Sequence, residues 1–370
     1  MRVLHFYKNA LPDSLGGVEQ VIDQIAQGTK LLGVKNTILA LSNLPYPNKI
    51  TINGYELIRA KRDFEFASNG FSWQSIALFR DLVNEVDLIH YHFPWPFADL
   101  VHTIINPKKP TILTYHSDII RQKILLPIYR PLMHHFLKSV DYIVATSPNY
   151  LKTSLTLQNF LDKTSVIPIG LDSQTYPSPN PSLVRFFKAH FGNRFFLFVG
   201  AFRYYKGLHY LLEAAKTSRY PIVIAGAGPI ESKLKVKVKK ARLNNIFFVG
   251  QISEEAKNAL LESCFAIVFP SHLRSEAFGV SLLEGAMYGK PLISCEIGTG
   301  TSFINIDHET GLVISPANSM ELSQAMAWLW NHPEEALKMG KQARLRFQKL
   351  FTADQMAMSY YDLYRKALNH

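Results

Sequence analysis

Two glutamates eight residues apart, Glu276 and Glu284, stand in the part of this sequence most able to do chemistry. Glu284 interrupts an otherwise apolar helix start, and burying a carboxylate without a partner costs on the order of several kcal/mol. A ligand rich in hydroxyl groups, such as a sugar or a ribose, could donate hydrogen bonds to such a carboxylate. A glutamate satisfied by the backbone or by Arg274 is the competing interpretation. We favour the ligand, because it accounts for the position of the charge.

The sequence also offers groups that suit a phosphate. The start of the helix predicted near Phe278–Val280 would point backbone amides toward an anion. Arg203 and Lys206 are three residues apart and follow the predicted strand Phe195–Val199. Two cations at the carboxyl end of a strand can hold the two phosphates of a leaving diphosphate and neutralise the charge that grows as its bond breaks. The alternative is two solvated surface charges.

The first half of the chain contributes a glycine pair and a histidine. Gly16 and Gly17 open a predicted helix one loop after the first strand, where glycine lets a ligand approach the backbone and free N–H groups favour a phosphate. A plain strand-to-helix turn also favours glycine, and the third glycine of a dinucleotide fingerprint is missing. His116 ends another predicted strand, where it could touch a sugar or steady a charge, or simply satisfy a local hydrogen bond.

These residues need elements that position them. Short apolar runs, each followed by a turn and a longer helical pattern, recur along the chain, which is typical of α/β domains with parallel sheets. Such sheets bind ligands beyond the carboxyl ends of their strands. The predicted strands are Val3–Tyr7, Thr37–Leu41, Tyr55–Arg59, Asp87–His90, Thr111–Tyr115 and Tyr142–Thr146, then Phe195–Val199, Pro221–Ala225, Ile246–Val249, Ala266–Phe269, Pro291–Ser294 and Gly311–Ile314. Helices are expected between them, notably at Val18–Leu32 and Arg121–Lys138.

The length of 370 residues favours two domains with separate cores. Between the two series of strands, Pro168–Pro181 concentrates Pro, Ser, Asp and Asn without periodicity, which indicates a linker. We place the first domain at residues 1–175 and the second at 176–353. The last helix, Asp354–Leu368, has an apolar face that needs a surface to cover, either on its own domain or back on the first.

Composition narrows the class of protein. No apolar run is long enough to span a bilayer and the start lacks a signal-peptide cleavage site, so we expect a cytoplasmic location. Cys264 and Cys295 stand in apolar stretches outside any paired motif, which predicts two reduced core thiols and no structural metal. The formal net charge of +11 favours an anionic partner, unless it is only a solvated surface.

Together these features resemble the retaining glycosyltransferase family 4, whose members have two Rossmann-like domains facing across a cleft, the GT-B arrangement. The resemblance covers essentially the whole chain. It is carried by the two glutamates within SEAFGVSLLEGAMYGKP, by RYYKG at Arg203–Gly207 and by GAGP at Gly226–Pro229. It implies an α/β fold with an N-terminal acceptor-binding domain and a C-terminal nucleotide-sugar-binding domain.

The resemblance also implies a role for each candidate residue. Glu276 would contact the transferred sugar and Glu284 the ribose, while Arg203 and Lys206 would bind the diphosphate. With His116, the cleft histidine, the residues Glu276, Arg203 and Lys206 form the expected catalytic set. The other expected donor contacts are Phe278, Gly279 and Val280 at the sugar and phosphates, Gly250 beside the nucleobase, and Gly16 and Gly17 in a loop that closes over the donor.

The implied reaction is transfer with retention, without cofactor or metal, and no Asp-x-Asp motif occurs in the chain. The nucleotide diphosphate would leave an oxocarbenium-like centre, the acceptor would attack on the same face, and the leaving phosphate would take its proton. Glu276 would position the sugar and stabilise charge rather than act as a covalent nucleophile. The opening VLHFYK and PDSLGGVEQVI resembles bacterial transferases of O-antigen and related surface polysaccharides, often mannosyltransferases that use GDP-mannose. UDP-sugar donors are the alternative.

The expected acceptor is a polyprenyl-diphosphate-linked saccharide at a membrane. The basic amphipathic segment Ile119–Leu137 could lie on an anionic surface and place the protein peripherally on the inner face of the cytoplasmic membrane. A core-facing helix kinked at Pro127 or Pro131 is the alternative. A second basic stretch, Lys233–Arg242, indicates a solvated helix face or further membrane attraction. It lacks interleaved aromatic residues, so no nucleic-acid partner is expected.

Three rival functions use the same residues differently. A nucleotide-sugar epimerase on a similar frame would bind the same donors without an acceptor. A glycoside hydrolase would use Glu276 and Glu284 as its carboxylate pair, but it has no need of Arg203 and Lys206. A non-catalytic sugar- or phosphate-binding scaffold is the third.

Overall fold

The computed structural model describes residues 1–14, 16–66, 69–119 and 125–369. They form two compact units, Met1–Gly170 together with the segment that begins at Ala353, and Leu171–Thr352. The break at Gly170 lies inside the predicted linker, slightly before the boundary at residue 175 that the sequence suggested. Ala353 belongs to the first unit and not to the second. Among the described residues, no helix is both long and apolar enough to cross a membrane.

The first unit is built on an eight-stranded sheet of order β10-β9-β8-β7-β1-β2-β4-β3, parallel except for the edge strand β3. All six predicted strands of this half are present, because their apolar runs are buried on both faces of the sheet. The strands are β1 Arg2–Phe6, β2 Lys35–Ser42, β3 Lys49–Ile52, β4 Tyr55–Lys61, β7 Leu88–Phe93, β8 Thr111–Tyr115, β9 Tyr142–Ala145 and β10 Thr164–Val166. The sequence missed β3 and β10, short strands with exposed positions, and the small pair β5 Phe64–Phe66 and β6 Asn69–Phe71.

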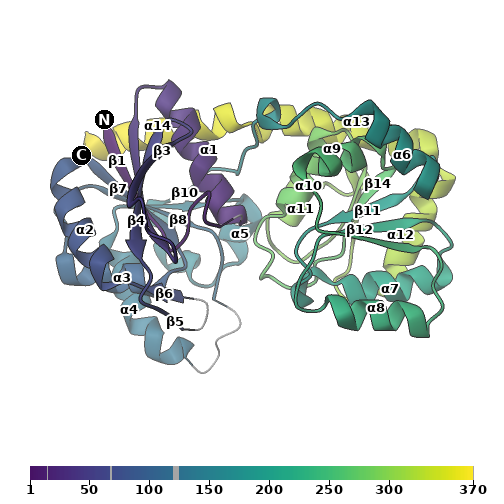
Figure 1. Cartoon of the computed structure of the whole chain (residues 1–370), viewed down its shortest axis with the longest axis horizontal. Helices are drawn as coiled ribbons and strands as arrows, with labels where there is room; N and C mark the ends of the chain where they lie inside the picture. Colours follow the sequence, from purple (N-terminus) through teal and green to yellow (C-terminus); the bar gives the residue numbers. More distant parts are fainter. Residues whose placement is uncertain (15, 67–68, 120–124, 370) are drawn as a thin grey trace. The chain divides into compact units, whose positions relative to one another are not determined.

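Helices cover this sheet, and one of them comes from the end of the chain. The helix α14 (Ala353–Leu368) packs along α1 (Gly17–Leu31) and against β7 and β8, as Figure 1 shows in yellow beside purple. The two helices approach closely at Gly28, where a Cβ atom would stand 2.5 Å from the Cβ of Ala357. The other helices are α2 Trp73–Glu85, α3 Pro96–Ile105, α4 Leu126–Ser139, α5 Pro148–Thr153 and the 3₁₀ helix η1 Leu157–Lys163.

The second unit has a six-stranded, fully parallel sheet of order β13-β12-β11-β14-β15-β16. All six strands were predicted: β11 Phe196–Val199, β12 Ile222–Ala225, β13 Ile246–Gly250, β14 Ala266–Phe269, β15 Leu292–Cys295 and β16 Gly311–Ile314. Each fully buried Ile, Leu or Val contributes about 1.5–3 kcal/mol to folding, which is why the apolar runs mark the strands.

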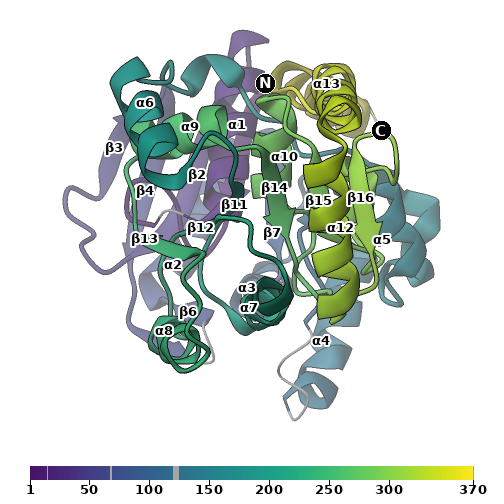
Figure 2. The same ribbon diagram turned by 90° about the vertical axis from the view of Figure 1, so that its right-hand side faces the viewer.

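Helices lie on both sides of this second sheet. Figure 1 shows α6, α9 and α13 on one side and α7 and α8 on the other, and Figure 2 shows α12 along β15 and β16. The helices are η2 Ser173–Thr175, α6 Pro181–Phe191, η3 Tyr204–Lys206, α7 Leu208–Thr217, α8 Glu231–Lys240, α9 Glu254–Ser263, α10 Val280–Met287, α11 Thr301–Ile304, α12 Ser319–Asn331 and α13 Pro333–Leu350. The sheet order reverses between β11 and β14, the position at which open parallel sheets bind their ligands.

Candidate functional site

Lys206 and Glu276, predicted separately from the sequence, form an ion pair beyond the carboxyl ends of β11 and β14. The Nζ of Lys206 lies 2.5 Å from Oε2 of Glu276, and their side chains are only 11% and 10% exposed. Ser271 Oγ donates to the same oxygen over 3.2 Å. The ammonium also lies 4.5 Å from the ring centre of Phe269, a cation–π contact. The site thus holds a cation and an anion side by side, fixed from several directions.

A glycine brings the two strand-end loops together. Gly207, which follows η3, has φ +71°, and a Cβ there would stand 1.9 Å from the carbonyl oxygen of Pro270. Only glycine fits a positive φ at so close an approach. His272, two residues beyond Pro270, donates its backbone N–H to the carbonyl of Tyr205 over 2.9 Å. This contact between loops is what places Lys206 against Glu276.

Glu284 lies on α10, buried, and the expectation that it lacks a protein partner is wrong. Lys257 Nζ on α9 lies 2.8 Å from its Oε1, and the hydroxyl of Tyr176 donates to the same oxygen over 3.1 Å. Arg274, the partner considered from the sequence, instead donates to the carbonyl of Gly298 over 2.9 Å. The charge on Glu284 is therefore neutralised within its own unit.

Lys257 also contacts a second carboxylate, Glu254, at 2.6 Å. Burial lowers the pKa of Lys257, but the carboxylates of Glu284 and Glu254 together raise it by more. The pKa of Lys257 therefore lies above the ordinary lysine value. The lysine is thus charged throughout the neutral range. The phenol of Tyr176 has its pKa raised by burial and by Glu284, so it remains a hydrogen-bond donor.

The closest contacts of each glutamate run to a single oxygen. In Glu276 this oxygen is Oε2, and in Glu284 it is Oε1. The other oxygen of each carboxylate has no hydrogen bond or ion pair with the residues that the structure describes, so it is the one left for a ligand. An ionised carboxylate accepts hydrogen bonds only, so a ligand there must donate them, as hydroxyl groups do.

The start of α10 supplies backbone amides next to Glu276. Its N-cap is Gly279, with φ +103° and no side-chain cap, so no side chain occupies the free N–H groups of the first turn. Phe278 is buried and packs against Phe351, with ring centres 6.2 Å apart, which fixes the entry into the helix at Val280. This geometry suits an anion.

The remaining predicted donor residues of this unit differ in how they are held. Gly250 ends β13 with φ +70°, its carbonyl accepts from the N–H of Gly226, and no atom would meet a Cβ there within 4 Å. Arg203 is exposed, and its side chain makes no hydrogen bond or ion pair with the described residues. The structure therefore brings Lys206, Glu276 and the start of α10 together but leaves Arg203 free in solvent.

Sequence reasoning missed four residues of this site: Tyr176, Lys257, Ser271 and His272. Only Pro270 separates Ser271 and His272 from the end of β14, so their position beyond a strand was a usable signal. The Nδ1 of His272 is buried without a hydrogen-bond partner. Lys257 on a helix and Tyr176 in the linker offered no such signal, because only packing brings them to Glu284.

In the first unit, the glycine pair opens α1. A Cβ at Gly16 would stand 2.2 Å from Oε2 of Glu19, whose carboxylate accepts from Ser14 over 2.9 Å and from Asn9 over 3.2 Å. Gly17 has open space around it. Beside this loop, beyond the ends of β1 and β2, lies a pocket of about 350 Å³ that is lined by Asn9, Asp13, Ser14, Leu41, Ser42, Asn43, Leu44 and Arg62.

His116 directly follows β8 and is buried. Burial lowers its pKa to about 3, so the ring is neutral at physiological pH and cannot steady a charge as an imidazolium. Its Nε2 lies 3.1 Å from Nδ1 of His92. The contribution of His116 is therefore that of a neutral hydrogen-bonding group.

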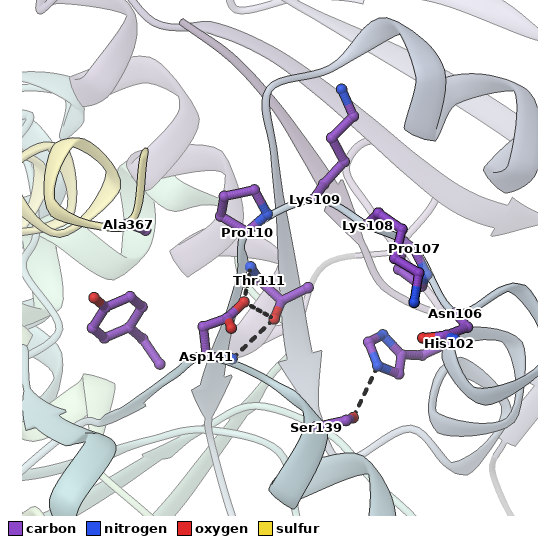
Figure 3. Close-up of a pocket in the computed structure, with 11 residues that line it drawn as sticks. His102, Asn106, Pro107, Lys108, Lys109, Pro110, Thr111, Ser139, Asp141 and Ala367 are labelled. Atoms are coloured by element: carbon purple, nitrogen blue, oxygen red, sulfur yellow. Dashed lines mark hydrogen bonds between the residues drawn. The ribbon is translucent and has the colours of Figure 1, made fainter. Parts of the chain in front are cut away.

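Another pocket, of about 560 Å³, lies at the opposite end of the first sheet, where β8 begins (Figure 3). Here Asp141 accepts from the N–H and the hydroxyl of Thr111 over 2.8 and 2.7 Å, and Ser139 contacts His102 at 2.9 Å. None of the predicted residues lines it. Because ligands of parallel sheets bind at the carboxyl ends of the strands, we do not assign this pocket to the site.

The proposed membrane segment Ile119–Leu137 is described only in part, since residues 120–124, with Arg121 and Lys123, lie outside the described residues. From Leu126 it forms α4, with Pro127 in the first turn and Pro131 inside. Its second half faces the core through Met133, Phe136 and Leu137, whereas Ile128 in the first half is 78% exposed. The stretch Lys233–Arg242 falls largely on α8, of which Leu234 is the buried residue.

Solved structures with the same architecture define the fold. A sucrose-phosphate synthase from Thermosynechococcus elongatus superposes with a TM-score of 0.82 at 20% identity, covering 99% of this chain and 98% of that one. The Anabaena protein Alr3699/HepE, solved in complex with UDP, superposes with a TM-score of 0.80 at 15% identity over 99% and 100% of the two chains. With its two Rossmann-like units, this protein has the GT-B fold.

The sequence comparisons give the family. Residues 15–175 match the model "Glycosyltransferase Family 4" and residues 185–346 match "Glycosyl transferases group 1". The D-rhamnosyltransferase WbpZ of Pseudomonas aeruginosa is 53% identical over 95% of this chain and 93% of its own length. O-antigen chain mannosyltransferase C of Escherichia coli is 47% identical over 100% and 99%. The chain belongs to glycosyltransferase family 4.

Proposed function

We propose that this protein is a retaining, metal-independent transferase that moves a sugar from GDP-mannose to a lipid-linked saccharide during O-antigen or related surface-polysaccharide synthesis. The observation that carries the proposal is the Lys206–Glu276 pair beside the uncapped start of α10. It combines a cation and free amides for a diphosphate with a carboxylate for a sugar. The near full-length similarity to a D-rhamnosyltransferase and an O-antigen chain mannosyltransferase supports the choice of sugar, because D-rhamnose is 6-deoxymannose.

Each group of the second unit has a place in donor binding. The free oxygen of Glu284 accepts from the ribose hydroxyls, and that of Glu276 accepts from a hydroxyl of the transferred sugar. Lys206 and Arg203 bind the diphosphate, together with the amides at Phe278, Gly279 and Val280. The open strand end at Gly250 receives the nucleobase. Lys257 and Tyr176 hold Glu284 in place for the ribose.

The chemistry follows from these contacts. The bond between the anomeric carbon and the diphosphate oxygen breaks, and its electron pair leaves with the β-phosphate, whose growing charge Lys206 and Arg203 stabilise. The acceptor oxygen forms its bond to the same face of the anomeric carbon. Its proton passes to the departing phosphate oxygen. Glu276 positions the sugar and stabilises the positive charge that develops on it.

The first unit is proposed to bind the acceptor. The pocket beside Gly16 offers hydroxyl, amide and guanidinium groups of Ser14, Asn9 and Arg62 to a saccharide, and the Nε of Arg62 is buried there without a hydrogen-bond partner. Gly16 and Gly17 are proposed to contact the donor, and His116 is the proposed catalytic residue of this unit. A polyprenyl-diphosphate anchor places the acceptor at the inner face of the cytoplasmic membrane, where the exposed start of α4 is the proposed contact.

Two experiments test the proposal. Unfolding temperatures measured with GDP, UDP, ADP and their sugars should rise with GDP ligands, because a ligand bound only by the folded state stabilises it by mass action. Equal stabilisation by UDP ligands would redirect the donor assignment. NMR of the product formed from GDP-mannose and a saccharide acceptor should show a retained α linkage; an inverted linkage, or an isomerised donor formed without acceptor, would refute the reaction.

Flotation with vesicles tests the membrane contact separately. Full-length protein should float with vesicles that contain anionic lipid and should sediment with neutral ones. Ile128→Asp should weaken flotation, whereas Leu337→Asp, at an apolar residue of α13 that is 59% exposed, serves as the control. Equal flotation of both variants would remove α4 from the proposed surface.

A further inference from the structure

Three imidazoles form a continuous hydrogen-bonded chain inside the first unit. Nδ1 of His5 on β1 lies 3.1 Å from Nε2 of His92 on β7, and Nδ1 of His92 lies 3.1 Å from Nε2 of His116 after β8. At its inner end, Nε2 of His5 lies 3.2 Å from Oδ1 of Asn36 on β2. The chain therefore runs across the sheet from β2 to His116.

The inner end of the chain has a fixed direction. The Nδ2 of Asn36 donates to the carbonyl of Ala26 over 2.9 Å and to Oγ1 of Thr29 over 3.0 Å. Thr29 can only accept there, because its own hydroxyl donates to the carbonyl of Ile25 over 2.7 Å. Carbonyl oxygens cannot donate, so the amide of Asn36 cannot be turned around, and its Oδ1 must be the acceptor toward His5.

The acceptor role of Asn36 fixes which nitrogen donates and which accepts in each of the three histidine rings. Since Asn36 accepts, His5 must carry its proton on Nε2, which leaves Nδ1 as an acceptor in the neutral imidazole. His92 must then donate from Nε2 and accept at Nδ1. His116 in turn must donate from Nε2. The proton of His116 is therefore held on the side facing the core, and its Nδ1 carries a lone pair.

This fixed direction of the hydrogen bonds requires neutral imidazole rings, and burial keeps them neutral. It lowers the pKa of His5 to about 4 and that of His116 to about 3, and it lowers the pKa of His92 well below the ordinary value. The Nδ1 of His116 makes no hydrogen bond with the described residues. Among the ring nitrogens of His5, His92 and His116, this nitrogen is the one still open to a ligand.

We infer that Asn36, His5 and His92 are positioning residues that lock His116 in the Nε2–H tautomer, so that its Nδ1 accepts a hydrogen bond from a hydroxyl of the saccharide substrate. The inference deepens the proposed function and rests on His116 facing the substrate. It specifies the chemistry of the contact: His116 recognises a hydroxyl donor, and it cannot donate to a carbonyl or a phosphate.

The neighbouring histidine, His90, belongs to a separate network. Its Nδ1 lies 2.8 Å from the hydroxyl of Tyr364 and its Nε2 lies 2.7 Å from Oγ1 of Thr114. Ring nitrogens of His5, His90 and His92 lie within 4.8 Å of one another, a spacing open to a metal ion. All six nitrogens already have hydrogen-bond partners, and binding a metal through His5 or His92 would break the chain to His116. We therefore expect the hydrogen bonds from Asn36 through His5 and His92 to His116 to remain intact when a metal ion is added.

Nitrogen NMR tests the tautomer without reference to activity. The full-length protein is labelled with ¹⁵N-histidine, and two-bond ¹H–¹⁵N spectra distinguish protonated from unprotonated ring nitrogens; the signal absent in His116→Asn identifies His116. We expect an unprotonated Nδ1 and a protonated Nε2, unchanged when Zn²⁺ is added. A protonated Nδ1, or a spectrum shifted to metal-bound imidazoles, would overturn the chain.

Variants of His92 test the positioning role. His92→Phe removes both hydrogen bonds, whereas His92→Gln keeps one donor and one acceptor at similar spacing. His90→Phe, on the same strand and equally buried, is the matched control outside the chain. We expect His92→Phe to give mixed tautomers of His116 and about tenfold lower kcat/KM, the equivalent of one hydrogen bond, while His92→Gln and His90→Phe retain the wild-type spectrum and rate.

Substrates that lack one hydroxyl at a time complete the test. The penalty of His92→Phe should vanish for the one deoxy substrate that no longer donates to His116. Wild-type transfer by His92→Phe, or a penalty that is equal for all deoxy substrates, would overturn the positioning role even with the expected tautomer. Failure of the wild-type protein to bind or transfer any nucleotide sugar would instead refute the proposed function and leave the NMR result standing.

Discussion

Replacement of Lys257 by methionine tests how Glu284 is held. Methionine keeps the length of the side chain and removes the charge, which leaves the buried carboxylate of Glu284 with Tyr176 as its remaining donor. Breaking a buried ion pair costs about 3–5 kcal/mol. We take about 2–3 kcal/mol here, because the hydrogen bond from Tyr176 survives and the lysine side chain is 12% exposed.

A loss of this size should lower the unfolding temperature of the second unit by roughly 5–10 °C, given about 2–4 °C per kcal/mol for a domain of 150–250 residues. The assay is thermal unfolding of the full-length protein, following the transition that shifts with added nucleotide. Lys235→Met is the matched control, since it removes an ion pair to Glu231 whose partners are 54% and 26% exposed. That pair should contribute at most about 1 kcal/mol.

The double variant Lys257→Met/Glu284→Gln should recover part of the loss, because the unpaired charge is then absent. In the wild-type protein the pKa of Lys257 is raised, so its stabilisation is present below the ordinary lysine pKa and is lost as pH rises through the folded value. The difference between wild type and Lys257→Met should therefore persist across neutral pH and shrink in strong alkali. If Lys257→Met unfolds at the same temperature as Lys235→Met, the reasoning about Glu284 is refuted.

Four further outcomes are expected. Glu276→Gln should lower kcat about a hundredfold or more in initial-rate measurements, because it removes the charge at the transferred sugar. GDP binding, measured by calorimetry, should be retained because Lys206 is still present. Normal turnover would exclude the carboxylate of Glu276 from the reaction. Arg203→Ala should weaken GDP binding with an unchanged unfolding temperature of the free protein, since its exposed side chain contacts none of the described residues. In urea unfolding, Gly207→Ala should lower the free energy of unfolding by about 3 kcal/mol or more, and Gly250→Ala by only about 1 kcal/mol. Both glycines have φ near +70°, but an added Cβ would collide only at Gly207. Similar losses for the two variants would contradict the close approach at Gly207. In the folded first unit the pKa values of His5 and His116 are lowered to about 4 and about 3, so the unfolded state takes up protons first as the pH falls. The free energy of unfolding of this unit should therefore decrease as the pH falls below about 6.5. A free energy of unfolding that stays constant from pH 7 to 5 would contradict this expectation.

The strands were predictable because their apolar runs are continuous and doubly buried. Runs such as Ile222–Ala225 and Ala266–Phe269 contain no polar residue, and a parallel sheet covered by helices leaves such a sequence no other stable place. The edge strands β3 and β10 were missed for the opposite reason. They are short, partly exposed and carry polar residues, so their pairing depends on the neighbouring strand rather than on their own pattern.

The candidate site was predictable to the level of residue types. Position after a strand singled out Lys206 and His116, and the interruption of an apolar helix singled out Glu284. Their partners were not predictable, because Lys257 and Tyr176 lie far from Glu284 in the sequence and carry no motif. In the sequence Glu284 has no visible partner, which suggested a ligand, whereas in the folded protein packing supplies Lys257.

What the sequence determined by itself is therefore the architecture and the chemical inventory: two α/β units, and carboxylates, cations and glycines beyond the strand ends. The tertiary structure decided which of these groups meet and in which protonation state. Lys206 faces Glu276 because Gly207 lets two loops touch, and the proton of His116 faces inward because Asn36, on another strand, cannot turn its amide around. The physical reason is that burial and hydrogen-bond direction are properties of surroundings assembled from distant parts of the chain, which no local pattern contains.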